Sequence, residues 1–214
     1  MPGKIVYVQE VNHIAADFEQ TWKKQNQSKA AHLPHSRLYL LDGSRSRDLY
    51  EEIFEAIRQA RQSIKLLSPY VSKPLLSVLE QLDTHVDVQI ITPLSNNKSI
   101  MTHLLLNEAK GKSWQIGLYK NGMSHAKALL IDDQKLIIGS SNFDFVSYEL
   151  EQEIVLATSD SALIKEFIDE VWDQDARHSI WENQRTKRHI GGTLAIFVAQ
   201  IFIRFLGLIY RLTK

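Results

Sequence analysis

The fold of this chain is decided by residues 124–153, which read SHAKALLIDDQKLIIGSSNFDFVSYELEQE. Two short apolar runs, residues 128–131 and 136–138, flank the polar sequence DDQK, whose composition is typical of a turn. This pattern predicts a β-hairpin. Because successive side chains of a strand alternate between its two faces, His125 and Lys127 should point the same way at the start of the first strand.

A second group of polar residues stands where the hairpin ends. Gly139 has no Cβ, so the backbone there could approach a ligand closely. Ser140 and Asn142 supply a hydroxyl and an amide that can hydrogen bond to phosphate oxygens. Together with an imidazole and an ammonium group, these side chains favour phosphodiester chemistry.

The spacing of these residues resembles a known motif. Six residues fit, at every interval, the HxK(x)4D(x)6GSxN (HKD) motif of the phospholipase D superfamily: His125, Lys127, Asp132, Gly139, Ser140 and Asn142. At average residue frequencies, six such positions coincide by chance in roughly one chain in a million. The continuation resembles the ending of the cardiolipin synthase branch, with Asp144, Ser147 and Glu153 in register. Two positions depart, because many members carry arginine at position 146 and asparagine at position 151, where this chain has valine and glutamate.

The resemblance implies an enzyme that works through a covalent phosphohistidine, which an alcohol or water then resolves, while a second histidine protonates the leaving oxygen. It implies that His125 is the nucleophile or the general acid. The implied catalytic set is His125, Lys127, Asp132, Asn142 and Glu153, with Gly139 and Ser140 binding substrate. In this set Lys127, Asn142 and Ser140 stabilise charge on the phosphoryl oxygens, Glu153 fixes a histidine tautomer, and Asp132 is a structural and electrostatic partner.

Neither a metal nor a cofactor is expected, because the sequence has no cluster of carboxylates and histidines at ligand spacing. The absence of cysteine also excludes disulfides and thiolate metal sites.

The family's active site takes two HKD motifs, and this sequence contains one, since none of the other seven histidines is followed by a lysine two residues later. The partner would be a second copy in a homodimer or another HKD-bearing chain. Three functions stay open: a phosphatidyltransferase or phospholipase that acts on phospholipids, a single-motif endonuclease dimer, and a non-catalytic or split half.

Charge is distributed unevenly along the chain. Residues 183–214 carry six basic residues and no acid, whereas residues 1–182 carry 19 basic and 25 acidic residues. An acidic body makes nucleic acid an unfavoured partner, because nucleic acid attracts proteins through their lysines and arginines. A basic tail suits an anionic membrane surface. We therefore expect a protein at the cytoplasmic face of a membrane, peripheral or anchored by its C-terminal helix.

Residues 190–210 form an apolar stretch long enough to span a membrane. Thr193, Gln200, Arg204 and Arg211 are spaced by 7, 4 and 7 residues, which aligns them in one narrow polar stripe on a helix. A lipid-exposed span should not bury an arginine without a partner, so an interfacial amphipathic helix is favoured. A spanning helix and a soluble helix packed on the body or on a dimer partner remain alternatives.

Strand and helix patterns alternate through the rest of the chain, which predicts an α/β fold: a phospholipase D-like half with a mixed, mostly parallel sheet, helices on both faces, and a C-terminal amphipathic or hydrophobic helix. Further strands are expected at residues 38–41, 64–67, 86–91, 114–119 and 154–156, and helices at 47–62, 74–82, 99–110 and 161–173. Three segments follow. Residues 1–36 resemble the end of a preceding half, with a strand at 4–8, a helix from residue 12 and a linker from 25 to 36. Residues 37–178 form the domain with the motif, and residues 179–214 the membrane-associating tail.

Overall fold

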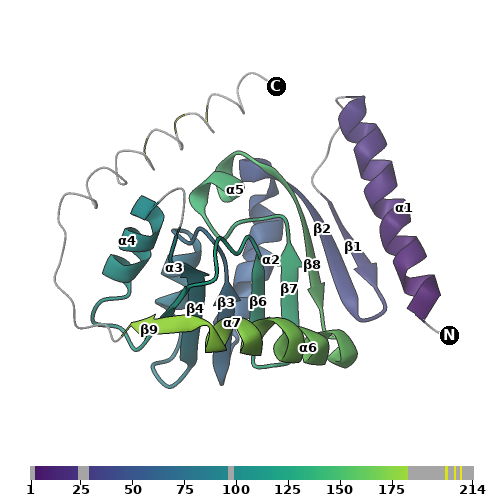
Figure 1. Ribbon diagram of the computed structural model, residues 1–214. Coiled ribbons are helices and arrows are strands. Elements are labelled where there is room, and N and C mark those ends of the chain that lie inside the picture. Colours follow the sequence, from purple (N-terminus) through teal and green to yellow (C-terminus); the bar gives the residue numbers. More distant parts are fainter. Residues whose placement is uncertain are drawn as a thin grey trace.

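The computed structural model describes residues 3–23, 29–95 and 99–182, together with residues 201, 205 and 208. These residues form a nine-stranded mixed sheet with helices on both faces (Figure 1). The predicted α/β fold is therefore confirmed.

The strands are β1 Lys29–Leu33, β2 Ser36–Asp42, β3 Ser63–Leu67, β4 Asp87–Pro93, β5 Gln115–Tyr119, β6 Ala128–Ile131, β7 Lys135–Gly139, β8 Gln152–Thr158 and β9 Ser179–Glu182. The helices are α1 Gly3–Trp22, the 3₁₀ turn η1 Gly43–Ser46, α2 Arg47–Arg58, α3 Leu75–Leu79, α4 Ser99–Glu108, α5 Phe145–Glu149, α6 Ser161–Phe167, the π-helical turn η2 Ile168–Trp172 and α7 Asp173–Arg177.

The strand order is β1-β2-β8-β7-β6-β3-β4-β5-β9. Only the β3–β4 and β4–β5 pairings are parallel, and the other six are antiparallel. The expectation of a mostly parallel sheet was therefore wrong. Parallel neighbours need a crossover connection, which α3 and α4 supply here, whereas hairpins such as β6–β7 join antiparallel strands.

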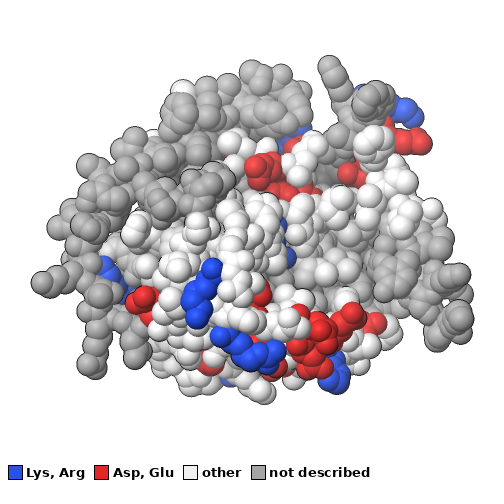
Figure 2. Space-filling model, in the orientation of Figure 1, with Lys and Arg blue, Asp and Glu red and all other residues white. Residues whose placement is uncertain are grey.

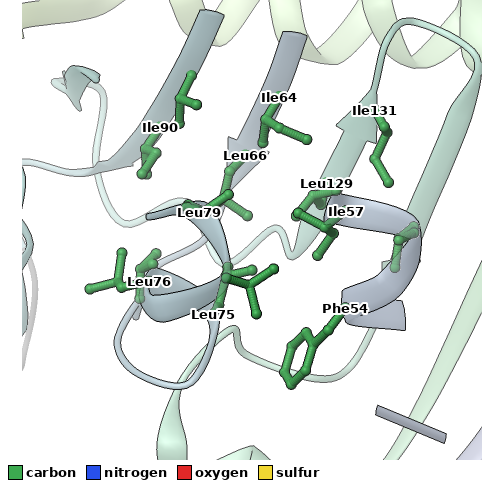
Figure 3. Packing of buried hydrophobic residues seen from close by; sticks show 14 of the residues in the cluster. Phe54, Ile57, Ile64, Leu66, Leu75, Leu76, Leu79, Ile90, Leu129 and Ile131 are labelled. Atoms are coloured by element: carbon green, nitrogen blue, oxygen red, sulfur yellow. The ribbon is translucent and has the colours of Figure 1, made fainter. Parts of the chain in front are cut away.

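The core has two layers because the central strands bury both of their faces. In β3, Leu66 packs into the cluster under α2 and α3, whereas Leu67 belongs to the cluster under α6 and Trp172. Figure 3 shows how Ile57 of α2 and residues of α3 point toward the strands of the first layer. The central hairpin is thus held rigidly from both sides, which fixes the position of the polar groups at its ends.

The N-terminal segment differs from its prediction. Residues 4–8 lie in helix α1, not in a strand, because the apolar spacing 7, 11, 14, 18 continues the helical period through them without a breaker. The linker predicted over residues 25–36 instead supplies strand β1, residues 29–33, which forms a hairpin with β2, residues 36–42, where a strand was predicted at 38–41. Residues 24–28 are outside the described part. The polar side chains of β1 are tolerated because it is an edge strand.

At the other end of the sheet, β9 extends the fold beyond residue 178 by pairing with β5. The division of the chain into residues 1–36, 37–178 and 179–214 stays a prediction. The helix expected over residues 190–210 lies outside the described residues, apart from the helical and exposed Ile201, Phe205 and Leu208. No helix in the described part of the chain is long and apolar enough to cross a membrane.

Candidate active site

Most of the predicted site residues meet at one edge of the sheet. His125 and Lys127 lie directly before β6, and Gly139 ends β7. Because β6 and β7 are antiparallel, the start of one lies beside the end of the other, and the Gly139 N–H donates to the Lys127 carbonyl at 3.3 Å. Glu153 lies in the next strand, β8. Residues 12 to 28 positions apart in the sequence are therefore brought together by the antiparallel pairing of β6, β7 and β8.

His125 and Lys127 point the same way, as predicted, although both precede the strand. The Lys127 Nζ lies 2.8 Å from His125 Nδ1 and also donates to the His125 carbonyl at 2.8 Å. Partial burial lowers the pKa of Lys127, and the negative charges of Glu153, Asp144 and Glu151 oppose that shift. A cation is thus held between an exposed imidazole and a group of carboxylates.

Glu153 is buried and has hydroxyl partners on both oxygens. The Ser140 hydroxyl donates to Oε2, and the Ser147 hydroxyl lies 2.8 Å from Oε1. Burial raises the pKa of Glu153, the two serine hydroxyls lower it, and the neighbouring Glu151 raises it again. No hydrogen bond between Glu153 and His125 is found in the described part of the chain, so the role of Glu153 in fixing a histidine tautomer stays a prediction.

Ser147 is placed by the short helix α5. The Asp144 carboxylate caps this helix by accepting from the backbone N–H of Val146 at 3.1 Å and of Ser147 at 3.0 Å. The Ser147 hydroxyl in turn accepts from the Asn142 N–H at 3.2 Å. Neither Asp144 nor Ser147 was among the predicted site residues, although their register in the motif ending was the signal that could have identified them.

Gly139 has a packing role between two strands, whereas Asn142 lies beside a small internal cavity. A Cβ at Gly139 would stand 2.1 Å from the Ile154 carbonyl oxygen, so the glycine is required by the close approach of β7 and β8. The Asn142 Oδ1 is buried and has no hydrogen-bond partner among the described residues. Asn142 is one of the residues that line a small cavity of about 30 Å³, whose walls also include Tyr50 and Phe54 of α2.

Asp132 is not brought to this group. It lies at the far end of β6, where its carboxylate accepts from the backbone N–H groups of Arg61, Gln62 and Ser63 at 2.8–2.9 Å. Partial burial alone would raise the pKa of Asp132, but these three hydrogen bonds lower it. Its contacts are therefore those of a residue that ties the β6–β7 turn to the start of β3.

An apolar groove of about 510 Å³ adjoins the site. Lys127 and Gly139 are among its lining residues, and the other lining residues come from the segment before β6 and from α1, β2, β6, β7, β8, α6 and η2, including Ile14, Ile154 and Phe167. Among the described residues, no group of three or more histidines and carboxylates is arranged to hold a metal ion.

Comparison with known proteins connects this geometry to one family. Residues 53–174 match the family model described as cardiolipin synthase, PLD-like domain. Similar curated proteins include the minor cardiolipin synthase ClsB of Bacillus subtilis, 30% identical over 151 residues, and cardiolipin synthase A of Buchnera aphidicola, 31% identical over 134 residues. The aligned parts cover 68% and 56% of this chain but only 36% and 28% of those proteins, so the chain spans about a third of their length.

Solved structures share the fold. The phospholipase D family member Nuc of Salmonella typhimurium is 18% identical with a TM-score of 0.55, and the alignment covers 68% of this chain and 99% of Nuc. The phosphatidylserine synthase of Haemophilus influenzae is 15% identical with a TM-score of 0.63, covering 84% of this chain and 49% of that one.

Proposed function

The chain belongs to the cardiolipin synthase PLD-like domain family, and from this premise we propose that it cleaves phosphodiester bonds of phospholipids and passes the phosphatidyl group to an alcohol or to water. The main support for this proposal is that His125, Lys127 and the Ser140–Glu153 pair lie close together where β6 begins and β7 ends. These groups are what a phosphoryl transfer without a metal requires: a nucleophile or acid, a cation and hydrogen-bond donors.

The proposed reaction has two steps. In the first, a histidine nitrogen attacks phosphorus, the bond to the leaving oxygen breaks, and a second histidine gives that oxygen its proton. In the second, an alcohol or water attacks the phosphohistidine and gives its proton to the second histidine, which restores both imidazoles. The Lys127 ammonium and the Asn142 amide stabilise the negative charge that develops on the phosphoryl oxygens.

We assign one of the two imidazoles to His125 and the other to a second HKD-bearing chain. The assignment is supported by the single motif in this sequence and by the exposure of His125, which leaves it accessible to a partner. The lysine contact at Nδ1 favours the tautomer in which that nitrogen carries no proton. Glu153 would act on the geometry of the site through Ser140 and Ser147.

We place the protein at the cytoplasmic face of a membrane, held there by its basic and apolar tail. Such a tail attracts anionic headgroups and buries its apolar face in the interface. Removal of residues 190–214 is then expected to abolish co-flotation with anionic vesicles. Unchanged flotation would refute the anchor.

The function is tested with purified protein and labelled phosphatidylglycerol in detergent micelles, with products followed by mass spectrometry. We expect cardiolipin or phosphatidic acid from the wild type, and a loss of at least 1,000-fold in His125→Ala, because a nucleophile or general acid contributes on this order. Glu166→Gln, an exposed change on α6, is the matched control and should leave turnover unchanged. Equal turnover by wild type and His125→Ala would exclude the proposed mechanism.

The chain length and the surface charge bear on the alternative function of a single-motif endonuclease. In its favour, the chain covers 99% of Nuc, which therefore has the length of one such domain. Against it, Figure 2 shows acidic side chains gathered over α6, and the segment 161–177 carries five acids and two bases. Cleavage of DNA at low salt without any lipid turnover would favour the endonuclease.

A further inference from the structure

The Ser147 hydroxyl lies between two carboxyl groups. Its Oγ is 2.8 Å from Glu151 Oε2 and 2.8 Å from Glu153 Oε1. It is also the acceptor of the Asn142 N–H at 3.2 Å. Three hydrogen-bonding partners therefore surround one hydroxyl.

Counting protons shows that this arrangement needs one more than the serine provides. A serine hydroxyl has one proton to donate and two lone pairs to accept with. One lone pair takes the Asn142 N–H, and the proton goes to one carboxylate. The other carboxyl oxygen, also at 2.8 Å, can be bound by the remaining lone pair only if that carboxyl carries a proton of its own. Two ionised carboxylates would leave one oxygen facing the hydroxyl oxygen without a hydrogen between them.

We infer that Glu151 and Glu153 share a single proton across the Ser147 hydroxyl, and that Glu151 is thereby a positioning residue for the Ser140–Glu153 side of the site. The shared proton stands on the geometry alone. The positioning role for the reaction rests on the proposed function.

The surrounding charges agree with a retained proton. Lys127 before β6 and Tyr50 of α2 each interact electrostatically with both glutamates of this pair, and also with Asp144 at the cap of α5. If all three carboxyls were ionised beside one ammonium, the site would hold a net charge of −2, and Tyr50 would add none because burial raises its pKa. One proton reduces that charge to −1. Burial and the proximity of Glu151 raise the pKa of Glu153 accordingly.

The proton has a structural consequence for the site. While the pair holds it, Glu153 Oε2 stays bound to the Ser140 hydroxyl and Oε1 to Ser147, which fixes the loop between β7 and α5. When the pair releases this proton to solvent, the two carboxylates repel each other. The exposed Glu151 is the one free to move away.

The variant Glu151→Gln keeps the shape of the side chain but cannot exchange a proton, so it tests the effect of the shared proton alone. Its amide NH₂ donates to Ser147 at every pH, so it reproduces the protonated state permanently. We expect ¹³C-carboxyl-labelled glutamate in the wild type to show one resonance that titrates above the ordinary glutamate pKa of 4.5. Glu151→Gln should move this titration to lower pH, because the second carboxyl is gone, and Glu166→Gln should leave it where it is.

The activity profile gives the second readout. If lipid turnover of the wild type falls with rising pH as the shared proton is lost, this fall should be absent in Glu151→Gln. Glu151→Ala should show reduced turnover at all pH values. A wild type without a raised glutamate titration, or a raised titration that does not move in Glu151→Gln, overturns the inference. A raised titration that moves to lower pH in Glu151→Gln, in a protein without any lipid turnover, supports the shared proton and counts against the proposed function alone.

Discussion

At the scale of single residues, the site is organised by hydroxyl groups as much as by the groups that would do the chemistry. Ser140 and Ser147 occupy both oxygens of Glu153, and Ser147 is itself set by the Asp144 cap. A buried carboxyl without such donors would cost several kcal/mol or take up a proton. The two serines therefore decide what Glu153 can do.

The proximity of His125, Lys127, Gly139, Ser140 and Glu153 could be predicted from the motif spacing, because antiparallel pairing of β6, β7 and β8 converts fixed intervals in sequence into proximity. Their roles in the chemistry, and that of Asn142, stay predictions. The sequence could not show that Ser147 links two carboxyl groups. Its contacts with Glu151 and Glu153 depend on how the chain returns to β8 after α5. Asp132 belongs to the motif but lies at the opposite end of β6, because a residue at the turn cannot share an edge with the strand's first residue.

A prediction about Asp132 follows from its contacts. Asp132→Ala removes the acceptor of three backbone N–H groups and is expected to lower the free energy of unfolding by about 2–3 kcal/mol near neutral pH. The folded-state pKa of Asp132 is lowered, so its contribution is full above the ordinary pKa of 3.8 and is lost as the pH falls through the folded value.

Urea denaturation of wild type and Asp132→Ala at neutral pH and at about pH 3 measures this. The difference between the two proteins should shrink at the lower pH. Asp133→Ala is the matched control, because Asp133 has the same positive φ of 53° as Asp132 but its side chain makes an ion pair with Lys65 in place of the three backbone contacts. It should cost clearly less than Asp132→Ala. A difference that grows on acidification would contradict the assigned role.

At the scale of elements, the interior strands and most helices could be predicted from apolar periodicity, because the core imposes that periodicity on both faces of the sheet. The edges could not. Residues 29–33 lie within the mostly polar stretch 25–36, which predicts a linker, yet they pair as β1, since an edge strand needs only one neighbour and can leave its other side in water. Residues 4–8 suit a strand by composition but continue the period of α1.

The packing of β7 against β8 gives a prediction for Gly139. Gly139→Ala would place a Cβ 2.1 Å from the Ile154 carbonyl, and the contact atom is backbone, so the strands must separate locally. We expect a loss of about 2–3 kcal/mol in the free energy of unfolding, as for overpacked cores, together with weaker protection of the Ser140 amide, which donates to the Ile154 carbonyl at 2.9 Å.

Denaturant unfolding and amide hydrogen exchange test this together. Gly111→Ala is the matched control, because its φ of +77° brings strain but no neighbouring atom lies within 4 Å of the added Cβ. It should cost about 1 kcal/mol and leave exchange at Ser140 unchanged. Equal destabilisation by the two substitutions would show that the close approach of β7 and β8 is unimportant.

At the scale of the whole molecule, the apolar groove beside the single motif is a surface through which a second copy could supply the second motif. Lys127 is one of the residues that line the groove, which also exposes Ile14 and Ile154 with accessibilities of 36% and 37%. In a dimer with twofold symmetry, the same patch of both copies forms the interface. A copy that covers this groove would lie beside Lys127, where a site with two histidines needs it.

The prediction that follows concerns Ile154→Glu. Placing a carboxylate in a face that is buried against its own copy costs at least about 1.4 kcal/mol, which raises the dissociation constant of the dimer at least tenfold. Light scattering at a series of concentrations should show dimers for the wild type and monomers for Ile154→Glu, with lipid turnover lost in parallel. Ile180→Glu on β9 is the control, because Ile180 is 44% exposed but outside the groove, and it should remain dimeric and active. Since the substitution leaves every residue of the motif in place, an Ile154→Glu monomer with full turnover would mean that one copy of the motif is sufficient. A wild type that is monomeric and inactive until another HKD-bearing chain is added would instead assign the groove to that chain.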